Sequence, residues 1–182
     1  MIATSLRAFA FFTVLTGLAY PIAMTAFAHR VFHEKASGSI IFKNGAAVGS
    51  SLIAQKFESA GHFHSRPSAV DYNPLPSGGS NLGPTSADLK AKVEERRKAG
   101  MDGDMLFASG SGLDPEISPE SAELQATRIA ESRGLPTQQV MALVNRTTEW
   151  RQLGVLGEPR VNVLRLNLAL DQLATENSGR KK

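Results

Sequence analysis

The residues whose types and spacing could support chemistry begin with a pair of histidines. His62 and His64 are two positions apart, so on a strand both imidazoles would lie on one side and could bind zinc with help from Asp71. The sequence has no second cluster of ligand-type residues at metal-site spacing. Since histidines beside Phe63 and Arg66 are more often packing or hydrogen-bonding residues, we expect no metal site.

Hydrolytic motifs are absent from the sequence. It contains neither the G-x-x-x-x-G-K-[ST] phosphate-binding loop nor the D-K-T-G run that is phosphorylated in P-type pumps. Ser111 lies in S-G-S-G-L, which lacks the glycine that a nucleophile elbow places two residues before its serine. We therefore expect this chain not to be an enzyme on its own.

Two glycine-rich runs could each hold an anion or approach another backbone. A concave nest of N–H groups could form over Ser77, Gly78, Gly79, Ser80 and Asn81, a run similar to the L-S-G-G-Q signature that contacts nucleotide phosphate in ABC-type ATPases. Pro76 interrupts that signature and Ser80 takes the place of its glutamine, so a plain turn is the main alternative. The same alternatives apply to Ser109, Gly110, Ser111 and Gly112, where close contact with another subunit is a third.

Composition narrows the function classes further. The 182 residues carry 20 Lys and Arg against 17 Asp and Glu, and this formal charge of +3, with acids and bases interleaved, predicts no nucleic-acid partner. Without cysteine there is no disulfide, thiol chemistry or thiolate metal site. A hydrophobic fraction of 42% and a charged fraction of 20% are ordinary for a folded protein.

The N-terminal part of the chain is its most distinctive element. Ala8 to Ala28 are 21 residues without a charge, which as a helix would extend about 31 Å and match the hydrocarbon core of a bilayer. Small residues at helical spacing, Ala10, Thr13 and Gly17, either form a docking face for another helix or are an accident of composition. We predict a short cytoplasmic N-terminus over residues 1–7, a transmembrane helix over 8–28 and a soluble domain over 29–182.

A cleaved export signal is the alternative, because Ala26-Phe27-Ala28 fits the small-x-small cleavage pattern. The chain would then be a secreted periplasmic hydrolase or binding protein, and the residues that carry out its chemistry would be Ser111, His62 or His64, and Asp114. The apolar run is longer than the usual ~7–15 residues of a signal core, which favours a retained anchor. A short leader before such a run is typical of a signal-anchor with a cytoplasmic N-terminus, although positive charges flank both sides.

The rest of the chain predicts helices mixed with a few short strands, an α+β domain. Capping signals predict a helix that begins at Pro119 after the N-cap Ser118 and is closed by Gly134. Apolar residues at helical spacing predict further helices at Ser86–Ala99 and Thr137–Thr148. A further helix is expected over Ser50–Ala60. Strands are expected over Gly61–Ser65, over Asp104–Ala108 and over Gly38–Phe42, the last ending at a Lys43-Asn44-Gly45 turn. Residues 161–173 are predicted to begin as a strand and continue as a helix, and Arg66–Ser86, rich in proline and glycine, is a long loop.

Four segments together closely resemble one known family. They are FHSRPSAVDYN (63–73), SGGSNLGPT (77–85), ASGSGLDPEISPESAELQATRIA (108–130) and LGEPRVNVLRLNLALD (156–171). Their sequence, order and spacing resemble the C subunit family of the Kdp potassium-transporting P-type ATPases, and the likeness covers the whole chain with its N-terminal anchor. That family retains its anchor, so the cleavage-like Ala26-Phe27-Ala28 is a departure from its pattern.

The resemblance implies an accessory subunit of a complex in the bacterial inner membrane that uses ATP to import K⁺. A channel-like subunit would select the ion and a separate P-type subunit would hydrolyse ATP, so this chain would bind no cofactor stably. Its partners would be those two subunits and membrane lipid.

The resemblance further implies a catalytic chaperone that raises the ATP affinity of the hydrolysing subunit, with its soluble domain on the extracytoplasmic, periplasmic side. A loop outside the bilayer cannot touch ATP in the cytoplasm, so we expect the effect on ATP to travel through the complex. Nucleotide or partner contact is expected at residues 77–81, and no catalytic residue is expected. The residues expected to dock partners are Arg66, Tyr72, Asn73, Ser109, Gly110, Ser111, Gly112 and Asp114.

Overall fold

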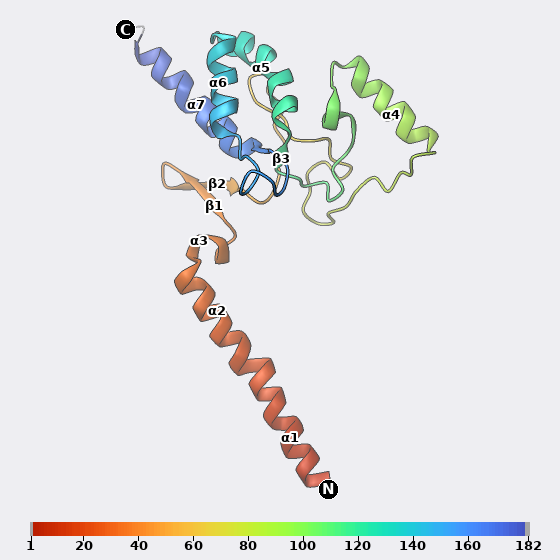
Figure 1. The fold of residues 1–182 in the computed structure, drawn as a ribbon, viewed down its shortest axis with the longest axis vertical. Helices are drawn as coiled ribbons and strands as arrows, with labels where there is room; N and C mark the ends of the chain where they lie inside the picture. The colour runs from red at the N-terminus through yellow and green to blue at the C-terminus, as the bar shows by residue number, and fades with distance from the viewer. Residues whose placement is uncertain (1, 181–182) are drawn as a thin grey trace. The chain divides into compact units, whose positions relative to one another are not determined.

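The structure is a computed structural model that describes residues 2–180 of the chain (Figure 1). It divides into two compact units, the first ending at Ser50 and the second starting at Ser51. Both contain helices and short strands, which confirms the predicted mixture of the two. The predicted boundaries at residues 7 and 28 concern the membrane and stay predictions.

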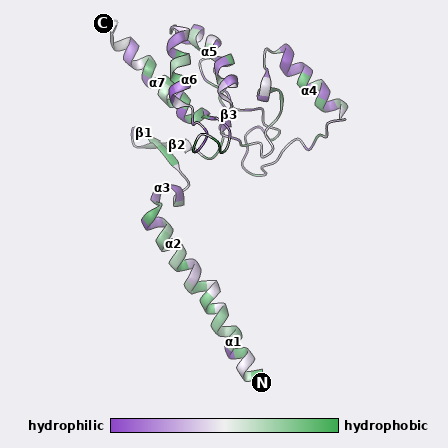
Figure 2. Cartoon of the chain, viewed as in Figure 1, coloured by the Kyte–Doolittle hydropathy of each residue, from purple (hydrophilic) through white to green (hydrophobic). Residues whose placement is uncertain are grey.

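The first unit begins with one long helix of apolar residues. α1 (Ile2–Val14), a π-helical turn (Leu15–Ala19) and α2 (Tyr20–Val31) follow one another without a break over 30 residues. Figure 2 shows hydrophobic residues along its length, and 0% of its most apolar window is buried. By length and composition this helix is able to cross a membrane, as the sequence predicts.

The π-helical turn marks the position of Pro21. Proline has no N–H, and its ring collides with the carbonyl four residues back, which here belongs to Gly17. The turn widens so that the Tyr20 N–H donates to the carbonyl of Leu15, five residues back. The helix therefore accommodates its proline by a change in its own backbone hydrogen bonding.

A hairpin completes the first unit. After α3 (His33–Ala36), strands β1 (Ile40–Lys43) and β2 (Ala46–Ser50) pair antiparallel around Asn44-Gly45, whose φ angles of 53° and 79° fit a type I′ turn. The register shifts between Ile41 and Phe42, so that β2 has one more residue than β1 at this step and forms a bulge. The predicted strand and its turn are confirmed, with the strand beginning at Ile40 rather than Gly38.

The helix predicted at Ser50–Ala60 is wrong. Ser50 ends β2, and residues 51–60 form turns and irregular chain. The apolar residues with helical spacing do not share a buried face, since Leu52 is 60% and Ile53 is 41% exposed. The segment instead bonds to distant residues, because the Ala54 N–H donates to the Leu113 carbonyl at 2.9 Å.

Three helices frame the second unit. α5 (Pro119–Arg133) starts at the N-cap Ser118, whose Oγ accepts from the Ser121 N–H, and ends at Gly134 with a φ of 62°. α6 (Thr137–Thr147) follows, and β4 (Val161–Asn162) leads into α7 (Val163–Arg180). All three predictions are confirmed, and at α5 the serine, proline and glycine at the helix ends are the local signals that set its bounds.

The remaining elements are short or peripheral. β3 (Glu116–Ile117) pairs with β4. The helix predicted at Ser86–Ala99 is confirmed as α4 (Ala87–Lys98), which is capped by Ser86 and has no buried residue. The strand predicted at Asp104–Ala108 is wrong, because Gly103–Leu106 is a 3₁₀ helix. Its Asp104 carboxylate accepts hydrogen bonds from the N–H and hydroxyl of Ser118, so the segment supports the start of α5 rather than a sheet.

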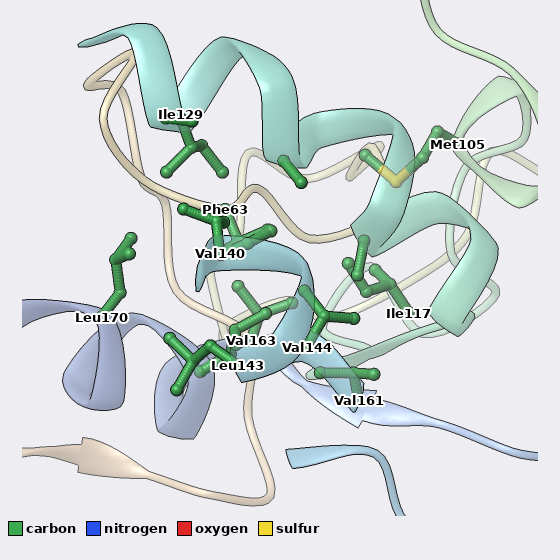
Figure 3. Packing of buried hydrophobic residues seen from close by; sticks show 14 residues of the cluster. Phe63, Met105, Ile117, Ile129, Val140, Leu143, Val144, Val161, Val163 and Leu170 are labelled. Carbon is green, nitrogen blue, oxygen red and sulfur yellow. The ribbon is translucent and has the colours of Figure 1, made fainter. Parts of the chain in front are cut away.

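The core of the second unit lies where α5, α6 and α7 meet (Figure 3). An irregular segment adds Phe63, whose exposed fraction is 0%. Each large apolar side chain buried in this way contributes about 1.5–3 kcal/mol. The fully buried members of the cluster include Phe63, Ile117, Ile129, Val140, Val144, Val161, Val163, Leu166 and Leu170.

Side-chain amides hold the segment around Phe63. The strand predicted at Gly61–Ser65 is wrong, because none of the strands within residues 2–180 pairs with it. The Phe63 N–H donates to Asn167 Oδ1 at 2.8 Å, and Asn167 Nδ2 donates back to the Phe63 carbonyl at 2.9 Å. Gln125 forms the same two bonds with the backbone of His64, at 2.8 and 3.2 Å. Amides from α7 and α5 thus take the place of a neighbouring strand.

We expect Asn167→Ala to destabilise the chain by about 3 kcal/mol, because both backbone groups of the buried Phe63 would lose their partner. Denaturant unfolding of the full chain in detergent measures this loss. Asn177→Ala on the same helix removes only an exposed bond to Gln139 and is the matched control. Equal stability of the two variants would contradict the role of the amide.

Candidate functional site

The two loops expected to dock partners lie against each other in the second unit. The Ser109 N–H donates to the Pro67 carbonyl at 2.9 Å, and Arg66 Nη1 lies 3.4 Å from Asp114 Oδ2. The Tyr72 hydroxyl donates to the Arg66 carbonyl at 3.0 Å, which holds the start of the long loop in place. The structure therefore brings four of the expected residues, from two distant segments, into one polar contact.

Glycine allows the closest of these loop contacts. A Cβ on Gly79 would lie 2.7 Å from the Gly110 carbonyl oxygen. A Cβ on Gly112 would lie 2.7 Å from the Gly78 carbonyl oxygen and 2.6 Å from Val70. Gly112 is also buried and has a φ of 72°, which favours glycine. The close backbone approach considered for another subunit is thus made within this chain.

Several of the expected contact residues remain open on the surface. Asn73, Gly110 and Ser111 are exposed, and so are Ser77 and Asn81 at the two ends of the first glycine run. Within residues 2–180 the backbone N–H groups of residues 77–81 make no hydrogen bond. Contact of this run with nucleotide or with a partner stays a prediction.

The histidines lie in a packed and hydrogen-bonded setting. The His62 ring stacks on Phe57 with 5.5 Å between ring centroids, and its Nε2 lies 4.0 Å from Asp171. Asp71, the third ligand considered for zinc, pairs with Lys56 instead. In the part of the chain that the structure describes, no group of three metal-ligand side chains comes together.

The residues of the hydrolase alternative bond to their own surroundings and not to a histidine, since Ser109 Oγ lies 3.3 Å from Ser111 Oγ and accepts from the Asp114 N–H. Ser111 Oγ accepts from the Leu113 N–H at 3.1 Å, and Asp114 pairs with Arg66. His64 Nε2 lies 3.1 Å from the carbonyl oxygen of Ser59. These contacts do not assemble a nucleophile, a base and an orienting acid.

The small residues of the N-terminal helix fall on both sides of a change in helix type. Ala10 and Thr13 belong to α1, whereas Gly17 lies in the π-helical turn. A π turn holds more residues than an α turn, so residues beyond it are rotated relative to Ala10 and Thr13. Docking of another helix on this face stays a prediction, and the face does not continue regularly into α2.

Sequence patterns do not reveal an apolar tip at residues 150–156. Trp150, Leu153, Val155 and Leu156 are 66%, 91%, 73% and 57% exposed. Two β-bridges, Glu149 with Arg160 and Gln152 with Leu156, hold the tip in one conformation.

The backbone of this tip is costly to form. Leu153 has a φ of 53°, a left-handed conformation that costs a non-glycine residue about 1–2 kcal/mol. Gly154 and Gly157, with φ angles of 76° and 78°, are the signal that could have placed a protruding turn here. A leucine that is strained and solvent-exposed does not stabilise the fold, so we expect it to serve a contact outside the chain.

Comparison with known proteins identifies the family. A family model described as "K+-transporting ATPase, c chain" matches residues 2–172. A protein of Rhodopseudomonas palustris strain BisB5, named potassium-transporting ATPase KdpC subunit, is 50% identical over 181 residues that span 87% of this chain and 90% of its own. Proteins of the same name from Gemmatimonas aurantiaca and Rhodospirillum rubrum are 50% and 49% identical over 88% and 90% of this chain and 87% and 91% of their own. The chain belongs to the KdpC family.

Membership of the KdpC family makes the chain a subunit of a K⁺-transporting ATPase. It confirms the resemblance carried by the four sequence segments, all of which lie within the matched residues 2–172. The matched region also includes the apolar helix and the exposed tip, so both belong to the part of the chain that the family shares.

We expect Gly112→Ala to cost about 2 kcal/mol or more of stability, because the new methyl would meet Val70 and the Gly78 carbonyl at a positive φ. Gly78→Ala enters open space and is the matched control, which should unfold like the unchanged chain. Circular dichroism of the full chain in detergent gives both unfolding midpoints. A Gly112→Ala chain with an unchanged midpoint and a weaker hold on its partners would show that this glycine serves a partner.

Burial lowers the pKa of His64 below its ordinary 6.5, and the charges of Arg128 and His62 act in the same direction. As the pH falls below about 6.5, His64 binds a proton in the unfolded chain before it does so in the folded chain. The contribution of His64 to the free energy of unfolding is therefore fully present above this pH and is lost as the pH falls below it. We expect His64→Gln to flatten that fall in denaturant titrations between about pH 7 and pH 5. His33→Gln, at an exposed position, is the control, and equal pH profiles for His64→Gln and the unchanged chain would contradict the assignment.

Proposed function

We propose that this chain is the accessory, non-catalytic subunit of an ATP-driven potassium import complex in the bacterial inner membrane. It stabilises the assembly and acts as a catalytic chaperone that raises the ATP affinity of the hydrolysing subunit. The observation that carries the proposal is the identity of 48–50% to proteins named potassium-transporting ATPase KdpC subunit. The bond of His64 Nε2 to the Ser59 carbonyl, rather than to Ser111 or Asp114, supports a role without chemistry of its own.

The N-terminal helix is the membrane anchor in this proposal. Its side chains are apolar and exposed, with Phe9, Phe11 and Ile22 at 70%, 62% and 65%. Lipid covers such a surface at a gain of roughly 25 cal/mol for each Å² removed from water. We propose that the helix is retained, that the N-terminus is cytoplasmic and that the second unit lies outside the cytoplasm.

The partners are a channel-like K⁺-translocating subunit and a P-type ATP-hydrolysing subunit. The apolar tip supports contact with one of them, because Leu153 exposes 91% of its surface in a backbone conformation that a leucine disfavours. Asn73, Gly110 and Ser111 offer a polar surface on the paired loops. Exposed apolar side chains and exposed polar side chains are both typical components of protein–protein interfaces.

The effect on ATP is indirect in this proposal. The first glycine run packs against the second loop, since the Gly110 carbonyl oxygen lies 2.7 Å from where a Gly79 Cβ would be. Its glycines thus have a role in loop packing that requires no nucleotide. A subunit that binds one state of the pump more tightly changes ATP affinity by typically about 5- to 150-fold without touching ATP.

The test compares complexes isolated from membranes with the unchanged chain, without it, and with Leu153→Gly. We expect Leu153→Gly to keep or raise the unfolding midpoint, because glycine relieves the positive φ, and to weaken complex recovery by about 10- to 100-fold through the lost apolar contact. ATP hydrolysis without the chain should need about 5- to 150-fold more ATP for half-maximal rate.

Leu124→Ala is the matched control for the tip, because Leu124 is also exposed, at 58%, and lies on regular helix in α5. An ATP dependence that is unchanged when the chain is omitted would contradict the chaperone role. Full recovery of the complex with Leu153→Gly would contradict docking through the tip but would not contradict the chaperone role.

A further inference from the structure

We propose that the β1–β2 hairpin rests on the anionic lipid headgroups of the membrane that α1 and α2 span. The contact would add a second, interfacial attachment to the helical anchor. This inference rests on the membrane anchoring in the proposed function and goes beyond it, because it assigns an occupant to the exposed face of the hairpin.

The hairpin carries apolar side chains on an exposed face. Ile40 and Phe42 are two positions apart on β1, so they share one face of the strand, and they are 43% and 66% exposed. Phe32, at the junction of α2 and α3, is 52% exposed. The two strands form a sheet of their own, and a lone two-stranded hairpin is marginally stable in water. Cover for this face would therefore stabilise the hairpin itself.

The chain keeps the hairpin near the end of the membrane helix. α2 ends at Val31 and β1 begins at Ile40, and four helical plus four extended residues span at most about 20 Å. Hydrogen bonds close this connection further, from the Ser39 N–H to the Glu34 carbonyl at 2.8 Å and from Ser50 Oγ to the Gly38 carbonyl at 2.7 Å. The hairpin is thus held by an ordered turn within reach of the headgroup layer.

Charge identifies lipid as the occupant. Residues 29–46 contain three permanently basic side chains, Arg30, Lys35 and Lys43, and one acid, Glu34. Basic side chains beside a membrane-spanning helix favour an anionic lipid surface by about 1 kcal/mol each, which is about fivefold. A lysine side chain can also pack its methylene groups against apolar side chains such as Phe42 while its ammonium group contacts the headgroups. A dry protein groove would favour the apolar face and disfavour these cations.

Fluorescence of the full chain in vesicles tests the proposal. Trp150 is the single tryptophan, so Trp150→Phe provides a background in which F42W is the only indole. The chain is reconstituted into phosphatidylcholine vesicles with or without phosphatidylglycerol, in which part of the lipid is brominated at the headgroup end of its acyl chains. We expect loss of F42W fluorescence in the anionic vesicles and a smaller loss in vesicles of phosphatidylcholine alone, which are the matched control.

Charge variants sharpen the measurement. Lys43→Gln should shift the ratio of docked to undocked hairpin by about fivefold, whereas Lys43→Arg, which keeps the positive charge, should leave it unchanged. I40W, on the same face as Phe42, is the second reporter and should be quenched like F42W.

The failures of the two proposals are distinguishable. A chain that resists alkaline extraction from the vesicles but whose F42W and I40W stay bright overturns the lipid contact and keeps the anchor. Shielding of F42W only when the partner subunits are present also overturns it and assigns the face to protein. Release of the chain by alkaline extraction overturns the anchor, and with it this inference.

Discussion

The fold of the second unit depends on pairing the backbone groups of a segment that enters its core without being a strand. Asn167 and Gln125 supply the hydrogen bonds that a neighbouring strand would give to Phe63 and His64. Because buried backbone groups must be paired, this arrangement lets an irregular segment enter the core between helices. Arg128 and Arg133 add bonds to the carbonyls of His62 and Gly61. The long loop that follows therefore leaves from a fixed base, and its glycines can meet those of the loop at residues 109–112.

The two units distribute their apolar side chains in opposite ways. The first exposes them along a 30-residue helix, and the second buries them where α5, α6 and α7 meet. The first pattern is favourable in lipid, where the helix satisfies its own backbone and its side chains meet acyl chains. The second is favourable in water. A membrane-anchored subunit with a water-soluble part accounts for both patterns in one chain.

Helix ends and turns that depend on a few neighbouring residues could be predicted from the sequence. Ser118 with Pro119, Gly134, Ser86 and the Asn44-Gly45 turn each carry their information within a few residues, and the structure has helix ends or a turn at all of them. The errors at residues 50–65 and 104–108 share a cause, because these segments take their hydrogen bonds from residues far along the chain. The spacing of apolar residues in the sequence cannot predict that Phe63 bonds to Asn167, which is 104 positions away.

The candidate site follows the same division. The glycine runs could be recognised as special from their composition, but their contact with each other depends on the whole fold. The tip at residues 150–156 could not be predicted from the sequence, because its apolar residues have neither helical nor strand spacing. Their types are those of core residues, and only the structure shows that they are exposed.

The central claim is that this chain acts as an anchored companion of larger subunits. Isolation of the tagged chain from bacterial membranes in mild detergent, followed by intact-mass measurement of every copurifying chain, tests it most directly. The account predicts a mass that includes the apolar helix, recovered together with a channel-like and an ATP-hydrolysing subunit. A chain recovered alone from the soluble fraction, with a mass that begins at His29, would contradict it.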